Sequence, residues 1–221
     1  MQYTKEQLAK FMDHTLLKPD ATRGQLEKLC SEAREYGTFS VCINPCNLKP
    51  ASELLEGSGV KLCTVVGFPL GQMTSEAKAF ETSEAVFAGA DEIDMVINVG
   101  RVKDGDLEYV REDIQSVVNA AQGRLTKVIL ETSLLTKTEI AEVSRIAKAC
   151  GADFVKTSTG FSTSGAKLED VRLMRETVGA DMGVKASGGI RTLADALAMI
   201  EAGATRLGVS ASIEILEELN E

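Results

Sequence analysis

Short runs of branched apolar residues alternate along this chain with longer stretches of helical periodicity. The apolar runs are nearly continuous and rich in β-branched residues, which is typical of parallel strands buried on both faces. We count an eighth, weaker run because a helical pattern follows it as it follows the others. The expected strands lie at residues 11–16, 40–43, 60–66, 92–97, 127–131, 153–157, 183–186 and 206–209.

Helical patterns fill the intervals between these strands. The first helix opens with Thr22 and Gln25 at capping-box spacing and ends at Gly37. The expected helices cover 22–36, 51–56, 75–87, 106–121, 137–149, 168–177, 193–201 and 212–219, with one extra N-terminal helix at 5–10. Eight alternating pairs predict an α/β fold of parallel βα units. Within 221 residues they favour a closed (β/α)8 TIM barrel over an open doubly wound sheet.

No linker, low-complexity tract or charge block interrupts this pattern, so we expect residues 1–221 to form a single domain. The net charge is −9, and no cluster of basic residues offsets it. This composition argues against nucleic acid or an anionic membrane as a partner. The N-terminal residues do not resemble a signal peptide, and no apolar stretch approaches the roughly 20 residues needed to span a membrane. A cytoplasmic protein is therefore expected.

The cysteine pattern does not favour a metal site. Five cysteines are scattered along the chain, and His14 is its only histidine. Cys42 and Cys46 lie near each other, but further zinc ligands are not apparent beside them. We expect reduced, mostly buried thiols.

Three charged residues interrupt the apolar strand patterns. Asp94 lies in IDMV, Lys156 in FVKTS and Lys185 in MGVKAS. Each follows a helix-ending glycine by five or six residues, so the three charges should lie at similar heights. A charge in a buried strand is unfavourable unless it is paired. A structural ion pair would explain any one of them, but the set near the C-terminal strand ends favours an active site.

Two neighbouring lysines suggest an amine nucleophile. A lysine with an ordinary pKa near 10.4 is only about 0.04% neutral at pH 7. A nearby like charge and partial burial both lower such a pKa, and Asp94 could relay protons or keep the second lysine charged. The residues themselves leave open which lysine is the nucleophile. The alternatives are a phosphosugar isomerase with Asp94 as base and a non-catalytic phosphate-binding barrel, neither of which needs a neutral amine.

Glycine- and serine-rich turns follow the last three strands. They are TSTG at 157–160, SGG at 187–189 and GVSAS at 208–212. Loops after late strands, together with a helix N-terminus, commonly bind phosphate in barrels of this type. We therefore expect a phosphorylated substrate.

Eight motifs are spread along the chain: MDHTLLKP, VCINP, VVGFPLG, GADEIDMVINVG, KVILETSLL, ADFVKTSTGF, VKASGGIRT and RLGVSAS. Together they resemble those of the deoxyribose-phosphate aldolase family. The resemblance implies a barrel lyase that reversibly cleaves 2-deoxy-D-ribose 5-phosphate to acetaldehyde and D-glyceraldehyde 3-phosphate. It implies a lysine Schiff base and neither a metal nor an organic cofactor.

The same resemblance assigns roles to individual residues. Lys156 matches the Schiff-base lysine, Lys185 and Asp94 match groups that transfer protons, and Asp13 matches a carboxylate that supports them. The positions implied around the substrate phosphate are Gly160, Gly188, Gly189 and Ser210.

The chain departs from some relatives near the phosphate. It has Phe161 where they have a lysine and Ala211 where they have a second serine, which bears on phosphate affinity rather than on the chemistry. We expect a homo-oligomer, because barrel enzymes often self-associate. Ordinary roles are expected for the remaining candidates: His14 at a strand end, Cys42 as a small buried thiol, and Glu131 facing the pocket or capping a loop.

Overall fold

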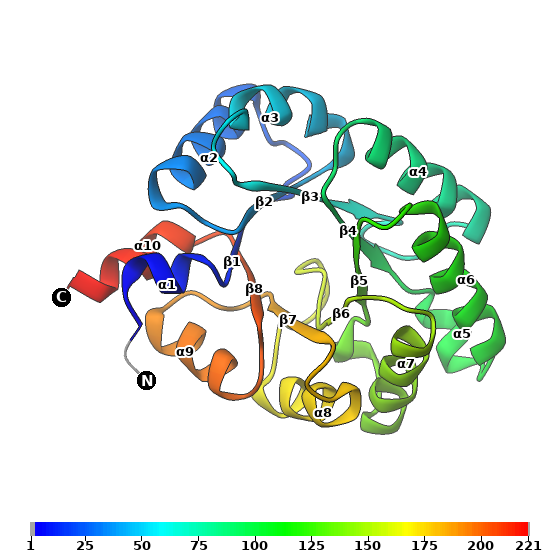
Figure 1. Cartoon of the computed structure of the whole chain (residues 1–221). Helices are drawn as coiled ribbons and strands as arrows, with labels where there is room; N and C mark the ends of the chain where they lie inside the picture. The colour runs from blue at the N-terminus through cyan, green and yellow to red at the C-terminus, as the bar shows by residue number, and fades with distance from the viewer. Residues whose placement is uncertain (1–2, 221) are drawn as a thin grey trace.

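Eight parallel strands follow one another around a closed barrel in the computed structural model, which describes residues 3–220. Each strand pairs with the next in sequence, and β1 pairs with β8 to close the ring (Figure 1). The strands are β1 (Met12–Leu16), β2 (Ser40–Ile43), β3 (Lys61–Val66), β4 (Glu92–Val96), β5 (Leu125–Ile129), β6 (Phe154–Lys156), β7 (Gly183–Ser187) and β8 (Arg206–Val209). The predicted (β/α)8 TIM barrel is confirmed.

The helices form a ring outside the strands (Figure 1). They are α1 (Lys5–Ala9), α2 (Arg23–Tyr36), α3 (Leu48–Leu55), α4 (Ser75–Phe87), α5 (Val99–Lys103), α6 (Leu107–Ala120), α7 (Lys137–Ala149), α8 (Leu168–Val178), α9 (Leu193–Glu201) and α10 (Ser212–Glu217). Short 3-10 helices lie at η1 (Pro45–Asn47), η2 (Thr132–Leu134) and η3 (Glu218–Asn220). Helix α1 is the predicted extra helix, and the predicted capping box of Thr22 and Gln25 is present in α2.

Three local predictions were incomplete. Helix α3 begins at Leu48 because Pro50 lies in its first turn, where a missing N–H costs no helical hydrogen bond. Strand β5 ends at Ile129, and Glu131 has a φ of 56°, which is incompatible with a strand. Helix α5 was not predicted; the Asn98 side chain caps it by accepting a hydrogen bond from the Arg101 N–H.

The apolar core lies between the strands and the helical ring. Alternate strand residues such as Ile93, Met95 and Val155 are fully buried there against helical residues such as Ile114 and Val117. The intervening strand residues face the barrel interior, and many of them are charged. The two lysine-bearing strands meet at one height, since Lys156 and Lys185 are register partners on β6 and β7.

A separate buried ion pair lies outside the barrel. The Lys78 ammonium on α4 donates to the Asp113 carboxylate on α6 at 2.5 Å, and both side chains are fully buried. The same ammonium donates to the Val96 carbonyl of β4 at 2.9 Å, so the pair links two outer helices to the outside of the barrel. In the part of the chain from 3 to 220, no helix is long and apolar enough to cross a membrane.

Candidate active site

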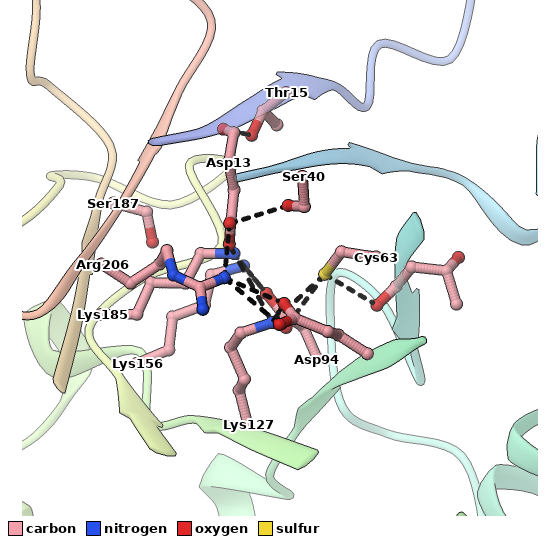
Figure 2. A network of polar contacts seen from close by, with 12 residues as sticks. Asp13, Thr15, Ser40, Cys63, Asp94, Lys127, Lys156, Lys185, Ser187 and Arg206 are labelled. Carbon is pink, nitrogen blue, oxygen red and sulfur yellow. Dashed lines mark hydrogen bonds and ion pairs between the residues drawn. The ribbon is translucent and has the colours of Figure 1, made fainter. Parts of the chain in front are cut away.

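Asp94 on β4 lies at the centre of a buried charge network (Figure 2). Its Oδ2 atom accepts hydrogen bonds from Lys156 Nζ at 2.9 Å and from Lys185 Nζ at 2.8 Å. Its Oδ1 atom accepts from Lys127 Nζ at 2.7 Å and from the Cys63 thiol at 3.3 Å. The three charges that interrupted the strand patterns are therefore brought together, as their matched heights predicted.

A second group of charges lies next to this centre. Asp13 on β1 contacts Lys185 and accepts from Arg206 Nη1 at 2.8 Å and from Ser40 Oγ at 2.7 Å. Glu92 accepts from Lys127 at 2.5 Å and from Arg206 at 3.0 Å. Asp13 was predicted, whereas Lys127, Glu92 and Arg206 were not. Glu92 precedes Asp94 by two residues, and residues two apart in a strand face the same side, so the sequence could have placed Glu92 beside Asp94.

The network fixes the ionisation of its members. Burial would raise the pKa of Asp94, but Lys127, Lys156 and Lys185 hold that pKa well below its usual range. Burial would likewise lower the pKa of Lys185, but Asp13 and Asp94 raise it well above its usual range. At neutral pH Asp94 is thus a carboxylate and Lys185 an ammonium group.

These pKa shifts predict that the free energy of unfolding decreases at low pH. Burial would also raise the pKa of Asp13, but Lys185, Lys127 and Arg206 lower the pKa of its carboxyl group below the usual value. Below about pH 4 the unfolded chain therefore binds protons that folded Asp13 and Asp94 do not. Their stabilisation is complete above that pH and is lost as pH falls towards the folded pKa values.

We expect the free energy of unfolding to fall by about 1.4 kcal/mol per pH unit for each of the two carboxylates below pH ~4. Urea unfolding at a series of pH values measures the slope. Asp94→Asn, which keeps Asp13, should show about half of the pH-dependent slope that the two carboxylates give together. A slope that is identical in the variant and the wild type would contradict this account.

An open cavity of about 300 Å³ lies at the C-terminal ends of the strands, and Lys156 lines it. Lys185 and Asp94 do not line the cavity; both side chains are fully buried behind Lys156. The four predicted phosphate positions line the same cavity, together with two cations that were not predicted. These residues are Gly160, Gly188, Gly189, Ser210, Lys18 and Arg191.

The glycine positions have the backbone conformation that a close approach requires. Gly160, Gly188 and Gly189 have φ angles of 85°, 82° and 80°, a region that side-chain-bearing residues rarely adopt. A Cβ atom on Gly160 or Gly189 would extend into open space. Backbone N–H groups in such glycine-rich turns can bind a ligand anion.

Phe161 occupies the edge of the cavity. Its side chain is 50% exposed and packs edge-to-face on Phe68 with ring centroids 5.4 Å apart. Positive charge near the glycines comes from Lys18 and Arg191 instead. The loop after β6, which carries Phe161, reaches over the centre of the barrel (Figure 1).

Among residues 3–220, two clusters of buried thiols and carboxylates each bring three possible metal-ligand atoms close together. One combines Cys42, Cys63 and Asp94, and the other combines Asp13, Cys63 and Glu92. The Lys127 ammonium lies 3.3 Å from the Cys63 sulfur and forms ion pairs with Asp94 and Glu92. An ammonium group already supplies the positive charge at both clusters, so the charge pattern does not favour a cation there.

His14 lies apart from the cavity that Lys156 lines. Its Nε2 atom is 3.0 Å from Glu32 Oε2, and its Nδ1 atom is 3.0 Å from the Ser212 hydroxyl. Ser212 is fully buried and its hydroxyl donates to the Val209 carbonyl. These contacts indicate that His14 has a structural role and links β1 to α2 through Glu32 and to α10 through Ser212.

Comparisons with known proteins bear on the family to which this chain belongs. A family model described as DeoC/LacD family aldolase matches residues 7–217. A Clostridium perfringens protein named deoxyribose-phosphate aldolase is 63% identical over 96% of both chains. A Streptococcus pneumoniae protein of the same name is 61% identical over 95% of this chain and 96% of its own. The tetrameric structure of the Aeropyrum pernix deoxyribose phosphate aldolase is similar with a TM-score of 0.91 and 37% identity, covering 99% of this chain and 93% of that one.

Proposed function

The chain belongs to the DeoC/LacD family of aldolases and is therefore a lyase, and from this premise we propose that it forms a Schiff base through Lys156. The proposed reaction is reversible cleavage of 2-deoxy-D-ribose 5-phosphate to acetaldehyde and D-glyceraldehyde 3-phosphate. The observation that carries the proposal is that Lys156 lines the cavity while Lys185 and Asp94 lie directly behind it. Access to the cavity separates the two lysines, which the sequence pattern could not do.

The proposed mechanism begins with attack of the neutral Lys156 amine on the aldehyde carbon of the open-chain sugar. Water leaves, and a protonated imine forms. Loss of the hydroxyl proton at C3, the carbon β to the imine, breaks the C2–C3 bond. The electron pair of that bond moves into the imine to give an enamine. Glyceraldehyde 3-phosphate departs, the enamine carbon takes up a proton, and hydrolysis releases acetaldehyde. Because Asp94 and Lys185 lie behind Lys156, we propose that a water molecule carries protons between them and the enamine carbon.

The balance of buried charge supports a neutral nucleophile. Three carboxylates, Asp13, Glu92 and Asp94, face four bases, Lys127, Lys156, Lys185 and Arg206. Loss of one proton leaves equal numbers of the two charges. Lys156 is the one of these bases that lines the cavity, so its deprotonation leaves each carboxylate with another cation.

The isomerase alternative requires Asp94 to remove a proton from the substrate. Asp94 is fully buried and does not line the cavity. The three lysines that hold its pKa well below the usual range also make it a weak base. Both observations favour an amine nucleophile over a carboxylate base.

Borohydride reduction in the presence of acetaldehyde tests the proposal. Reduction of the imine should leave N-ethyl-lysine at position 156, which peptide mass mapping identifies. The peptide that contains Lys185 serves as the internal control. Modification of Lys185 instead, or of neither lysine, would refute the assignment of the nucleophile.

We expect Lys185→Met to separate imine formation from turnover. The nucleophile and the cavity remain, so the borohydride adduct on Lys156 should still form. Loss of the buried ammonium group should lower kcat for cleavage by about 10²–10⁴-fold, the usual effect of removing a proton-transfer group. Trapping and steady-state kinetics on the same preparation measure both properties. Equal losses of adduct formation and of kcat would show that Lys185 does not act specifically in proton transfer.

For the phosphate, we expect Ser210→Glu to raise KM for deoxyribose 5-phosphate at least about tenfold, a loss typical of a repelled charge. Ser210 is exposed at the cavity edge near Gly188 and Gly189, so a carboxylate there would repel the substrate dianion. Unphosphorylated deoxyribose provides the control, because its kcat/KM should change much less. If both substrates lose the same factor, the phosphate is bound elsewhere.

We propose that the protein self-associates, as the tetrameric Aeropyrum pernix relative does. Two large apolar side chains on α4, Phe80 and Phe87, are 69% and 90% exposed. Their burial in an interface between subunits would be favourable. Light scattering after size-exclusion chromatography measures the mass in solution, and a monomer would contradict the proposal.

A further inference from the structure

Glu131 has an unusual backbone conformation just past the end of β5. Its φ and ψ angles are 56° and 62°, in the left-handed region that residues with a side chain rarely adopt. The side chain is nonetheless buried, with 4% of the residue exposed. A strained conformation at a buried charged residue persists when the surrounding structure holds it, and such residues cluster at functional sites.

The Glu131 carboxylate holds the loop that follows the Schiff-base strand. Its Oε2 atom accepts hydrogen bonds from the Thr159 N–H, at 3.2 Å, and from the Thr159 hydroxyl. The Thr159 hydroxyl oxygen in turn accepts from the Phe161 N–H at 3.0 Å. A chain of hydrogen bonds therefore runs from Glu131 through Thr159 to Phe161.

Backbone pairing holds both sides of this contact. The Leu130 N–H donates to the Lys156 carbonyl at 2.9 Å, and the Thr132 N–H donates to the Thr157 carbonyl at 2.9 Å. Residues 130–132 thus follow residues 156–157 closely, and Glu131 lies between the two backbone bonds. The carboxylate extends this pairing two residues further along the loop, to Thr159.

Thr159 and Phe161 form a wall between two cavities. Both line the cavity of Lys156, and both also line a neighbouring cavity of about 340 Å³. Glu131 lines the neighbouring cavity but not the catalytic one, together with apolar residues such as Leu70 and Leu134. The side-chain contacts of Glu131 therefore reach the cavity of Lys156 through Thr159 and Phe161.

We propose that Glu131 is a positioning residue for the aldolase reaction, which fixes Thr159 and Phe161 as the wall of the substrate cavity. This inference rests on the proposed function of Lys156. Only Oε2 has partners, and Oε1 has none among the described residues. One acceptor oxygen is therefore sufficient for the role, and the negative charge is not required.

Three substitutions at Glu131 separate the possible contributions. Glu131→Gln keeps an acceptor oxygen and removes the charge. Glu131→Ala removes the acceptor and keeps a Cβ atom in the strained conformation. Glu131→Gly removes the acceptor and relieves the strain, since glycine adopts a positive φ freely. Gln122→Ala is the matched control, because exposed Gln122 also has a positive φ, of 50°, but lies in the loop before β5.

The measurements are KM and kcat for deoxyribose 5-phosphate and the rate of borohydride trapping with acetaldehyde. Both Glu131→Ala and Glu131→Gly should raise KM by about 10- to 100-fold, the effect expected when a cavity wall is displaced by an ångström or less. Trapping at Lys156 should stay within about threefold of wild type, because acetaldehyde is too small to need the wall. Glu131→Gln and Gln122→Ala should behave like the wild type.

The results that overturn the proposal are distinct. Wild-type KM in Glu131→Gly would show that the side chain has no role, and a loss in Glu131→Gln equal to that in Glu131→Ala would show that the charge itself acts. If Glu131→Ala and Glu131→Gly do not fold, Thr159→Val removes the hydroxyl contact from the other side and must raise KM with trapping retained. Absence of trapping in the wild type would instead refute the Schiff base on Lys156.

Discussion

Replacing Lys156 by alanine is expected to lower kcat for cleavage by at least roughly 10⁴-fold, as loss of a covalent nucleophile does, while the barrel remains folded. Every other step in the proposed mechanism depends on the imine at this nitrogen. The fold should persist because Asp94 retains Lys127 and Lys185 as partners. Far-UV circular dichroism and the urea midpoint check the fold, and steady-state kinetics measure the loss.

Lys156→Arg is the companion variant. It keeps a positive charge and a long side chain, but a guanidinium group stays protonated and does not form an imine. Its activity should be as low as that of the alanine variant. Turnover near the wild-type level in either variant would remove Lys156 from the mechanism.

Asp94→Asn is expected to affect both catalysis and stability. The substitution removes a carboxylate that Lys156, Lys127 and Lys185 share as a partner. Breaking a buried ion pair from one side typically costs about 3–5 kcal/mol, and losing a proton-transfer group lowers kcat by about 10²–10⁴-fold. Urea unfolding and steady-state kinetics measure the two effects separately.

A matched control for this variant lies outside the barrel. Asp113→Asn breaks the equally buried pair with Lys78 between α4 and α6. It should be destabilised by a similar amount, about 3–5 kcal/mol, with kcat close to that of the wild type. If both variants lose kcat equally, the effect of Asp94→Asn comes from a weakened fold rather than from the site.

The strand order and the central charges followed from local patterns. Runs buried on both faces predicted parallel strands, and the glycines before them set a common starting height. Gly89, Gly151 and Gly179, from which the three charges are counted, do have positive φ angles and end the helices before these strands. Asp94, Lys156 and Lys185 consequently meet as predicted.

The rest of the network depended on contacts that no single strand reveals. Lys127 and Arg206 are the first residues of the predicted runs 127–131 and 206–209, where a charge is ordinary, so neither drew attention. Strand β5 in fact begins at Leu125, which puts Lys127 in its middle. The inward direction of both side chains is set by the register of β5 and β8 within the closed ring. The choice between Lys156 and Lys185 likewise depended on which side chain borders the cavity, a property of three-dimensional packing.

Closure of the ring between β1 and β8 has a consequence for the nascent chain. Asp13 is made well before its partner Arg206, which follows 193 residues later. Lys185, its other cationic contact at close range, lies on β7 and is also made long after Asp13. Until both have left the ribosome, burial of the Asp13 carboxylate is unfavourable, because a charge without a partner resists leaving water. The first strand must therefore wait for β7 and β8, and docking of β1 against β8 is a late step in folding of the barrel.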